Sequence, residues 1–285
     1  MSIRHGAIPS LALLAALCAL AAEPANVAQI MARVGANQET TRDARQLYVY
    51  RQEQLLRMHR GNGQLAREER AEYMVMPAKQ GSEKQLAKFA GKYEFKGKYV
   101  AYDQPDYHYK GVDIDGDLIH DMAEDMMNDK KSRDGLGKDL FPLTAEEQRK
   151  YDFRLVGTEL YRGRSAYRVA FQPRPNAHHD EDGTSWKGEA LIDTEEYQPV
   201  LVVTSLAEKV PLLVKTLLGT DIKGLGFSVT YQKFAGGVWF PVSYGGEFEV
   251  RGLFFYKRKI SVSMRNSDFR KTDVNSTVVY VTDAH

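Results

Sequence analysis

Cysteine is nearly absent from this sequence of 285 residues. The one cysteine, Cys18, lies in an apolar segment near the N-terminus that has the features of a signal peptide. The rest of the chain has no thiol, which excludes a disulfide framework and thiol catalysis. The fold must therefore be held by its hydrophobic core, and a chain of this length can bury a sizeable one. A lipid anchor at Cys18 is disfavoured, because the bulky Leu17 precedes it where such signals have a small residue.

An excess of either charge is also lacking, since the chain has 39 basic and 38 acidic side chains. Arg4 lies in the N-terminal segment, so the two signs balance in the remainder of the chain. A neutral chain offers no general attraction for nucleic acid or for an anionic membrane. We therefore expect no nucleic-acid partner.

Long hydrophobic runs are confined to the N-terminus, where Leu11–Leu20 follows the basic residue Arg4. This run is too short to span a membrane, and it is followed by a small-x-small cleavage site that ends at Ala21. The pattern predicts a signal peptide over residues 1–21, with cleavage after Ala21 or Ala22. We expect a soluble protein that is periplasmic or secreted.

Short catalytic motifs are missing as well, including G-x-S-x-G, H-E-x-x-H, the P-loop and G-x-G-x-x-G. Two segments do carry metal-ligand side chains. His178–Asp182 lies in a polar loop, and adjacent side chains point in different directions, so we favour a solvated loop. Asp113–Asp117 resembles a calcium loop, but Leu118 occupies the position that requires glycine, so we favour a turn and helix cap. We expect no catalytic residue, no bound metal and no cofactor.

What the sequence does contain is a series of alternating apolar runs in its last third. They cover residues 225–234, 238–250 and 253–264, and glycines at 236, 237 and 252 mark tight turns between them. Alternate side chains of a strand lie on opposite faces, so these runs predict an antiparallel meander with one apolar face. Such a face must be covered by another sheet, a helix or a ligand.

The earlier chain adds strands and three helices. A helix is predicted from the cap Asn26 to Ala36, with Gly35 as its stop, and a second from the cap Asp117 to about Lys130. Thr144 starts a short third helix with a capping box. The further strands are predicted at 45–59, 65–76, 86–95, 99–102, 151–160, 165–171, 186–193 and 200–206. Apolar residues 210–218 form a helix or strand, and 278–281 a closing strand.

This order of roughly eleven strands with few helices predicts an α+β fold: a single domain over residues 22–285 that is built on a large antiparallel sheet. It resembles the LolA/LolB-like, outer-membrane lipoprotein-sorting superfamily. The resemblance is carried by the exported N-terminus, the early helix, the helix Leu118–Lys130 between two sets of strands, the stretch Gly188–Asp193 followed by Pro199-Val200, and the meander 226–248. It implies an open, curved half-barrel whose helices form a lid over a cavity for acyl chains.

From this resemblance and the one-sided sheet we expect a non-enzymatic, monomeric protein that binds or carries a lipid, a lipoprotein acyl chain or another hydrophobic ligand. An envelope protein partner is also expected. The residues predicted to line the cavity are Phe227, Val229, Tyr231, Phe240, Val242, Tyr256, Ile260 and Val262 on the sheet, with Met122 and Met126 on the lid. Two alternatives remain: an exported interaction module with a self-filled core, and, less favoured, a metal-dependent hydrolase that uses His178–Asp182.

Overall fold

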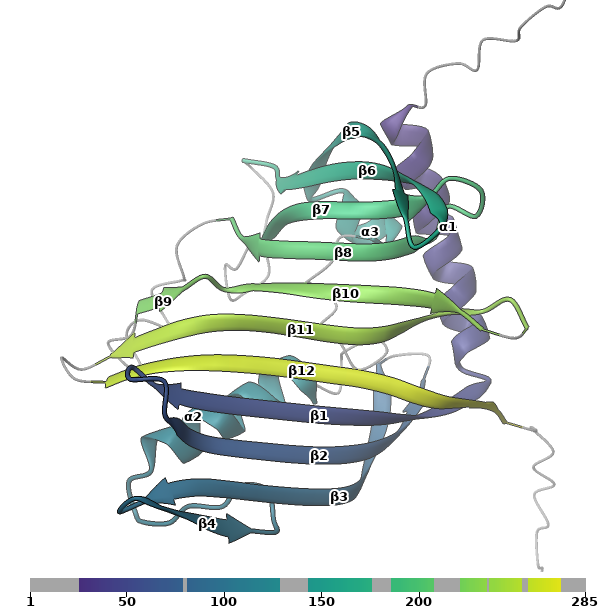
Figure 1. Cartoon of the computed structure of the whole chain (residues 1–285). Helices are drawn as coiled ribbons and strands as arrows, with labels where there is room; N and C mark the ends of the chain where they lie inside the picture. Colours follow the sequence, from purple (N-terminus) through teal and green to yellow (C-terminus); the bar gives the residue numbers. More distant parts are fainter. Residues whose placement is uncertain are drawn as a thin grey trace, which may run out of the picture.

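One curved antiparallel sheet dominates the computed structural model (Figure 1). The structure describes residues 26–78, 81–128, 143–175, 186–207, 221–234, 236–252 and 256–272. The predicted signal peptide and the segments His178–Asp182, 210–218 and 278–281 lie outside these ranges. The helices are α1 (Val27–Arg45), α2 (Ile114–Met122), the π-helix η1 (Ala123–Met127) and α3 (Ala145–Gln148). The strands are β1 (Tyr48–Arg60), β2 (Leu65–Pro77), β3 (Ser82–Phe95), β4 (Lys98–Tyr102), β5 (Tyr151–Tyr161), β6 (Arg164–Pro173), β7 (Trp186–Asp193), β8 (Pro199–Leu206), β9 (Asp221–Lys223), β10 (Gly226–Lys233), β11 (Trp239–Gly252) and β12 (Tyr256–Lys271).

The first and last strands meet in the middle of the sheet. The order is β4-β3-β2-β1-β12-β11-β10-β8-β7-β6-β5, and β9 pairs with β11. β1 pairs with β12 from Tyr48 opposite Lys271 to Arg60 opposite Arg258. The path through the described strands therefore ends at two edges, β4 and β5, and the sheet remains open, as expected (Figure 1).

The predicted one-sided burial is confirmed along the central strands. In β10, Phe227, Val229 and Tyr231 are buried, whereas the alternating positions are half-buried or exposed. β12 repeats the pattern with Ile260 and Val262. Helices α1 and α2 add buried side chains to the same apolar cluster, which we call the main core. The sheet is therefore apolar on the face that carries the helices.

The first helix is longer than predicted. Asn26 caps it, as expected, and accepts a hydrogen bond from the backbone N of Ala28. Gly35 does not end it, and α1 continues to Arg45, so that β1 starts at Tyr48. A Cβ on Gly35 would lie 3.3 Å from the backbone N of Ala145. The glycine therefore serves the close approach of α3 and is not a stop signal.

The second helix begins earlier than predicted. Its N-cap is Asp113, whose Oδ1 accepts a hydrogen bond from the backbone N of Gly116, and Asp117 lies inside the helix. α2 passes into the π-helix η1 at Ala123. The predicted start of the third helix is confirmed, because Thr144 caps it and accepts from the backbone N of Glu147. Among the described residues, no helix combines the length and apolar character that crossing a membrane requires.

Candidate functional site

The structure brings six of the predicted cavity residues into the main core. Phe227, Val229 and Tyr231 of β10 belong to the same apolar cluster as Ile260 and Val262 of β12, with side chains that are 0–8% exposed. From the other side, Met122 of α2 joins the same cluster. The apolar face of the sheet and the buried face of the helix are therefore in contact, in the arrangement expected of a lid.

The other four predicted residues lie elsewhere or differ in character. Phe240 belongs to a second apolar cluster, with Tyr48, Tyr50 and Val75. Val242 is half-buried, at a register shift between β10 and β11. This irregularity interrupts the regular alternation on which the shared face of Phe240 and Val242 was predicted. Tyr256 is half-buried and packs against the main core, and the side chain of Met126 lies outside the described residues.

We call the segment formed by α2 and η1 the lid. Two ion pairs hold its N-terminal end against the sheet. Asp113 Oδ2 lies 2.9 Å from Arg67 Nη1, and both side chains are at most 2% exposed. Asp115 is held by two donors of Arg258, at 2.8 and 3.0 Å, and by the Tyr256 hydroxyl at 2.8 Å. Two of the three aspartates of the calcium-like segment, Asp113 and Asp115, are therefore paired with arginine, and Asp117 lies 2.7 Å from His108 Nε2. No metal-ligand cluster is found in the part of the chain that the structure describes.

Arg67 sits in a fully buried polar cluster. Its Nε donates to the Tyr102 hydroxyl at 2.7 Å and to Glu69 at 3.2 Å, and the Tyr102 hydroxyl donates to Glu69 at 2.6 Å. Burial and the Glu69 carboxylate both raise the pKa of Tyr102, so this hydroxyl stays protonated. Every buried charge here has a partner, which makes the cluster a rigid anchor for α2.

Lys84 of β3 fastens the other end of the lid. Its Nζ donates to the Gln52 side chain at 2.7 Å, to the Asn128 side chain at 3.3 Å and to the backbone carbonyl of Met127 in η1. Burial lowers the pKa of Lys84 to about 7, and the charge of Glu124 opposes this shift. The lid thus lies between an arginine-held end and a lysine-held end, with its apolar residues in the middle.

Lys84 is part of a polar layer that sequence reasoning missed. Gln54 donates to Gln52 and to Asn128, and Gln52 donates to Asn266, each at 2.9 Å. These side chains occupy core-facing positions between the main core and the second cluster. The signal in the sequence was two glutamines at alternate positions of an otherwise amphipathic strand. A satisfied polar network of this kind fixes one arrangement of the lid.

A small hollow of about 30 Å³ remains between the lid and the sheet. Leu56 and Phe89 of the sheet, and His120 and Glu124 of the lid, contribute to its lining. This volume holds about one water molecule. A larger ligand would need the lid to move.

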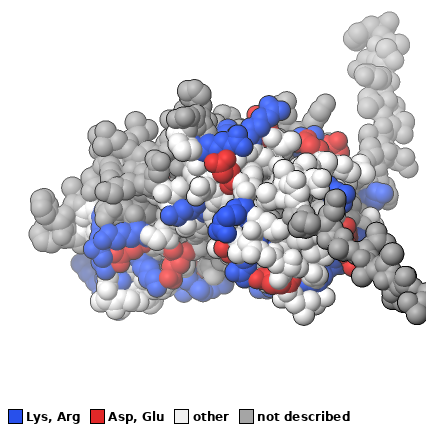
Figure 2. Space-filling view, turned by 90° about the horizontal axis from the view of Figure 1, so that it is seen from above, with Lys and Arg blue, Asp and Glu red and all other residues white. Residues whose placement is uncertain are grey.

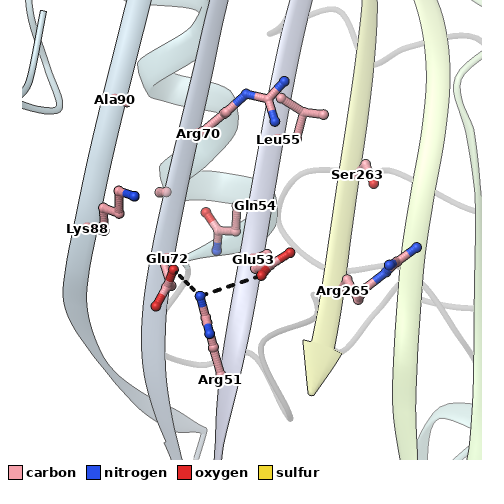
Figure 3. Close-up of a pocket in the computed structure, with 11 residues that line it drawn as sticks. Arg51, Glu53, Gln54, Leu55, Arg70, Glu72, Lys88, Ala90, Ser263 and Arg265 are labelled. Atoms are coloured by element: carbon pink, nitrogen blue, oxygen red, sulfur yellow. Dashed lines mark hydrogen bonds and ion pairs between the residues drawn. The ribbon is translucent and has the colours of Figure 1, made fainter. Parts of the chain in front are cut away.

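The face of the sheet away from the lid carries a charged groove of about 530 Å³ (Figure 3). Glu72 and Glu53 lie across the strands between Lys88 and Arg265. Arg51 bridges the two glutamates at 2.6 and 3.7 Å. Figure 2 shows acidic and basic side chains interspersed on the face seen from above, without a large area of one sign. Such pairs in contact with water are typical of a solvated surface.

Comparisons with known proteins give no match to a family model and none to a curated protein. Solved structures do match. A putative outer membrane lipoprotein-sorting protein domain from Vibrio parahaemolyticus is 11% identical, with 89% of this chain and 96% of that chain covered and a TM-score of 0.41. A LolA superfamily protein from Nitrosomonas europaea is 8% identical, with 83% and 94% covered and a TM-score of 0.33. The Mycobacterium tuberculosis lipoprotein LppX is 9% identical, with 88% and 99% covered and a TM-score of 0.27.

These matches include the superfamily that the sequence resembles. Their identities and TM-scores are low, so they carry no argument about function.

Proposed function

We propose that this chain is an exported, non-enzymatic protein that binds a hydrophobic ligand between its curved sheet and the lid. The observation that supports this proposal is the way the lid is held. Its middle, with Ile119 and Met122, packs on the main core, whereas both of its ends are fastened by polar contacts. An apolar interior under a separately latched cover is the arrangement that a releasable hydrocarbon requires.

Burial of hydrocarbon would supply the driving force. Each buried CH2 group contributes about 0.8 kcal/mol, so an acyl chain of twelve carbons would gain roughly 9 kcal/mol before the costs of ordering and of displacing the lid. Methionine side chains suit such an interface because they repack around ligands of different shape. Met122 and Met127 of the lid are both buried against the main core.

The polar latches let the lid leave without exposing its charges to an apolar medium. Asp115 and Arg258 are 19% and 16% exposed, so both charges can be solvated as the lid opens. The lid would therefore hinge from the deeply buried Arg67–Asp113 pair, while the Asp115 and Lys84 contacts break. Lid motion of this kind is a common way to gate a closed site.

Native mass spectrometry of gently purified protein tests the proposal. We expect a bound species with the added mass of a lipid or fatty acid. We also expect lipid-stripped protein to take up a fluorescent fatty acid. Protein that carries no lipid and takes up none would contradict hydrophobic-ligand binding.

A lid variant links binding to the proposed site. Asp115→Asn removes one partner of Arg258, so we expect faster uptake and release of the fluorescent fatty acid in stopped-flow measurements. Asp152→Asn is the matched control, because Asp152 of the edge strand β5 forms a surface pair with Arg174 at 3.0 Å, away from the lid. If the two variants and the wild type exchange the fatty acid at the same rate, the lid does not control ligand exchange.

A second candidate function is an exported interaction module with a self-filled core. The low exposure of the predicted cavity residues favours it, since Val229 and Ile260 are 0% exposed. The mass-spectrometric experiment decides between the two, because a self-filled core takes up no lipid.

Export itself is part of the proposal. The predicted cleavage after Ala21 or Ala22 should give a mature protein that begins at Ala22 or Glu23, which N-terminal sequencing of the periplasmic fraction would detect. Sedimentation analysis should show a monomer. An uncleaved cytoplasmic protein would contradict the periplasmic assignment without affecting ligand binding.

A further inference from the structure

A second hollow opens at the rim of the main core, far along the sheet from the lid. It has a volume of about 250 Å³ and lies where the β5–β6 turn meets β8, the end of β10 and the start of β11. Its floor is formed by Val200, Tyr231 and Trp239, which are all buried members of the main core. An apolar group in this hollow would therefore touch the same cluster that the lid covers.

The wall of the hollow carries three cations: Arg162, Arg164 and Lys233. Two carboxylates form ion pairs with two of these cations. Glu196 lies 2.8 Å from Lys233 and 3.3 Å from Arg164, and Asp193 lies 2.9 Å from Arg164. These three cations and two carboxylates together carry a net charge of +1.

Arg162 is the cation that no carboxylate pairs with in the described part of the chain. Its guanidinium lies 5.3 Å from the ring centroid of Tyr161, over the aromatic face. Arg162 and Gly163 have φ angles of +48° and +80°, as in the two-residue turns that tightly join antiparallel strands. The turn fixes the backbone of Arg162 at the rim, so its planar set of N–H donors is available to an incoming carboxylate or phosphate.

We propose that this hollow binds the anionic head group of an amphiphile whose apolar tail lies in the main core. The head group is a carboxylate or a phosphate, held by Arg162 with Lys233 and the Gln232 amide beside it. Tyr231 and Trp239 form the transition from the polar rim to the apolar floor, as amphipathic aromatic side chains do at other apolar boundaries. This inference rests on the proposed function and narrows the ligand to an acid with a hydrocarbon tail.

The test compares two ligands with the same tail. Laurate and its uncharged methyl ester each displace the neutral fluorophore N-phenyl-1-naphthylamine from lipid-stripped protein, and their affinities are measured. We expect laurate to bind about tenfold more tightly, the effect of one charge-assisted contact. Acetate and inorganic phosphate, which lack the tail, should displace nothing at the same concentrations.

Substitutions then locate the head group. Arg162→Asn keeps a residue that tolerates positive φ, so the turn should persist, and circular dichroism verifies the fold. It should lower laurate affinity about tenfold and leave the ester unchanged, whereas Arg162→Lys should retain part of the difference. Arg154→Gln removes the same charge from an exposed position of β5, the strand that precedes the turn, and should change neither affinity.

Two kinds of outcome would overturn the inference. In the first, the wild type binds laurate and ester equally, or the preference for the acid persists in Arg162→Asn. Either result refutes the head-group site but leaves the proposal of hydrophobic-ligand binding intact. Displacement by acetate or phosphate alone would indicate a site for a free anion. If neither laurate nor ester displaces the fluorophore, the proposed function itself fails, and the head-group site fails with it.

Discussion

Lys84 gives the sharpest test of how the lid is held. Burial lowers the pKa of this lysine from 10.5 to about 7. Between these two pH values the unfolded chain binds a proton that the folded protein has released, so the free energy of unfolding rises with pH across this window. A change from 10.5 to about 7 corresponds to at most about 5 kcal/mol. The oxygen acceptors around the ammonium offset part of this, so we expect about 2–4 kcal/mol.

The assay is urea unfolding, followed by tryptophan fluorescence, at several pH values from 6 to 9.5. Lys84→Met keeps a side chain of similar length without the amine, so its unfolding free energy should rise less steeply with pH than that of the wild type. The control is Lys88→Met, on the same strand but exposed on the opposite face. Tyr73, whose ring lies close to Lys84, has a pKa raised by burial, so it loses its proton at a higher pH than a free tyrosine.

The difference between wild type and Lys84→Met isolates the lysine from other titrating groups. Equal pH slopes in the two proteins would refute the reasoning, because they would show that the amine is as well solvated in the folded protein as in the unfolded chain. A change of slope in Lys88→Met equal to that in Lys84→Met would refute it too, since Lys88 has no comparable surroundings.

Three further predictions concern the stability of the sheet. Gly188→Ala should destabilise by about 1–3 kcal/mol in urea unfolding, because its Cβ would overlap a carbonyl oxygen of β8, whereas Gly157→Ala, with no atom within 4 Å, should be tolerated. Three basic side chains outweigh burial and lower the pKa of Glu68 to about 2, so its contribution is present above pH 4.5 and lost as the pH falls through 2; Glu68→Gln should flatten the acid limb of the stability curve, and an unchanged limb would count against the pairing. Arg67→Met should lower the free energy of unfolding by about 3–5 kcal/mol, because it leaves buried carboxylates unpaired, and adding Asp113→Asn should recover part of this loss. An unchanged free energy of unfolding in Arg67→Met would contradict a buried anchor.

The fold was predictable where the pattern was local. The alternation of Phe227, Val229 and Tyr231 gave the apolar face of β10, and Asn26 and Thr144 gave correct helix starts. The pairing of β1 with β12 joins segments about two hundred residues apart, and no local signal specifies it. The predicted end of the N-terminal helix was wrong, because the sequence does not distinguish a glycine needed for close packing, such as Gly35, from one that ends a helix.

The candidate site was predictable only in its apolar part. The arginine partners of Asp113 and Asp115 come from β2 and β12, far away in the chain, so no local signal specifies these pairs. Phe240 left the predicted set because a register shift changes the alternation in β11. Arg162 was overlooked because a cation in a turn is an ordinary surface residue until the fold sets it beside Trp239 and Tyr231.

The most direct measurement of whether the interior accepts hydrocarbon is a native mass spectrum of the lipid-stripped protein after incubation with phospholipid vesicles. We predict a second charge-state series, heavier than the bare polypeptide by one lipid, that Asp115→Asn populates sooner after mixing. A spectrum that shows only the bare polypeptide, from protein that is demonstrably folded, would contradict the account and leave the self-filled core in its place.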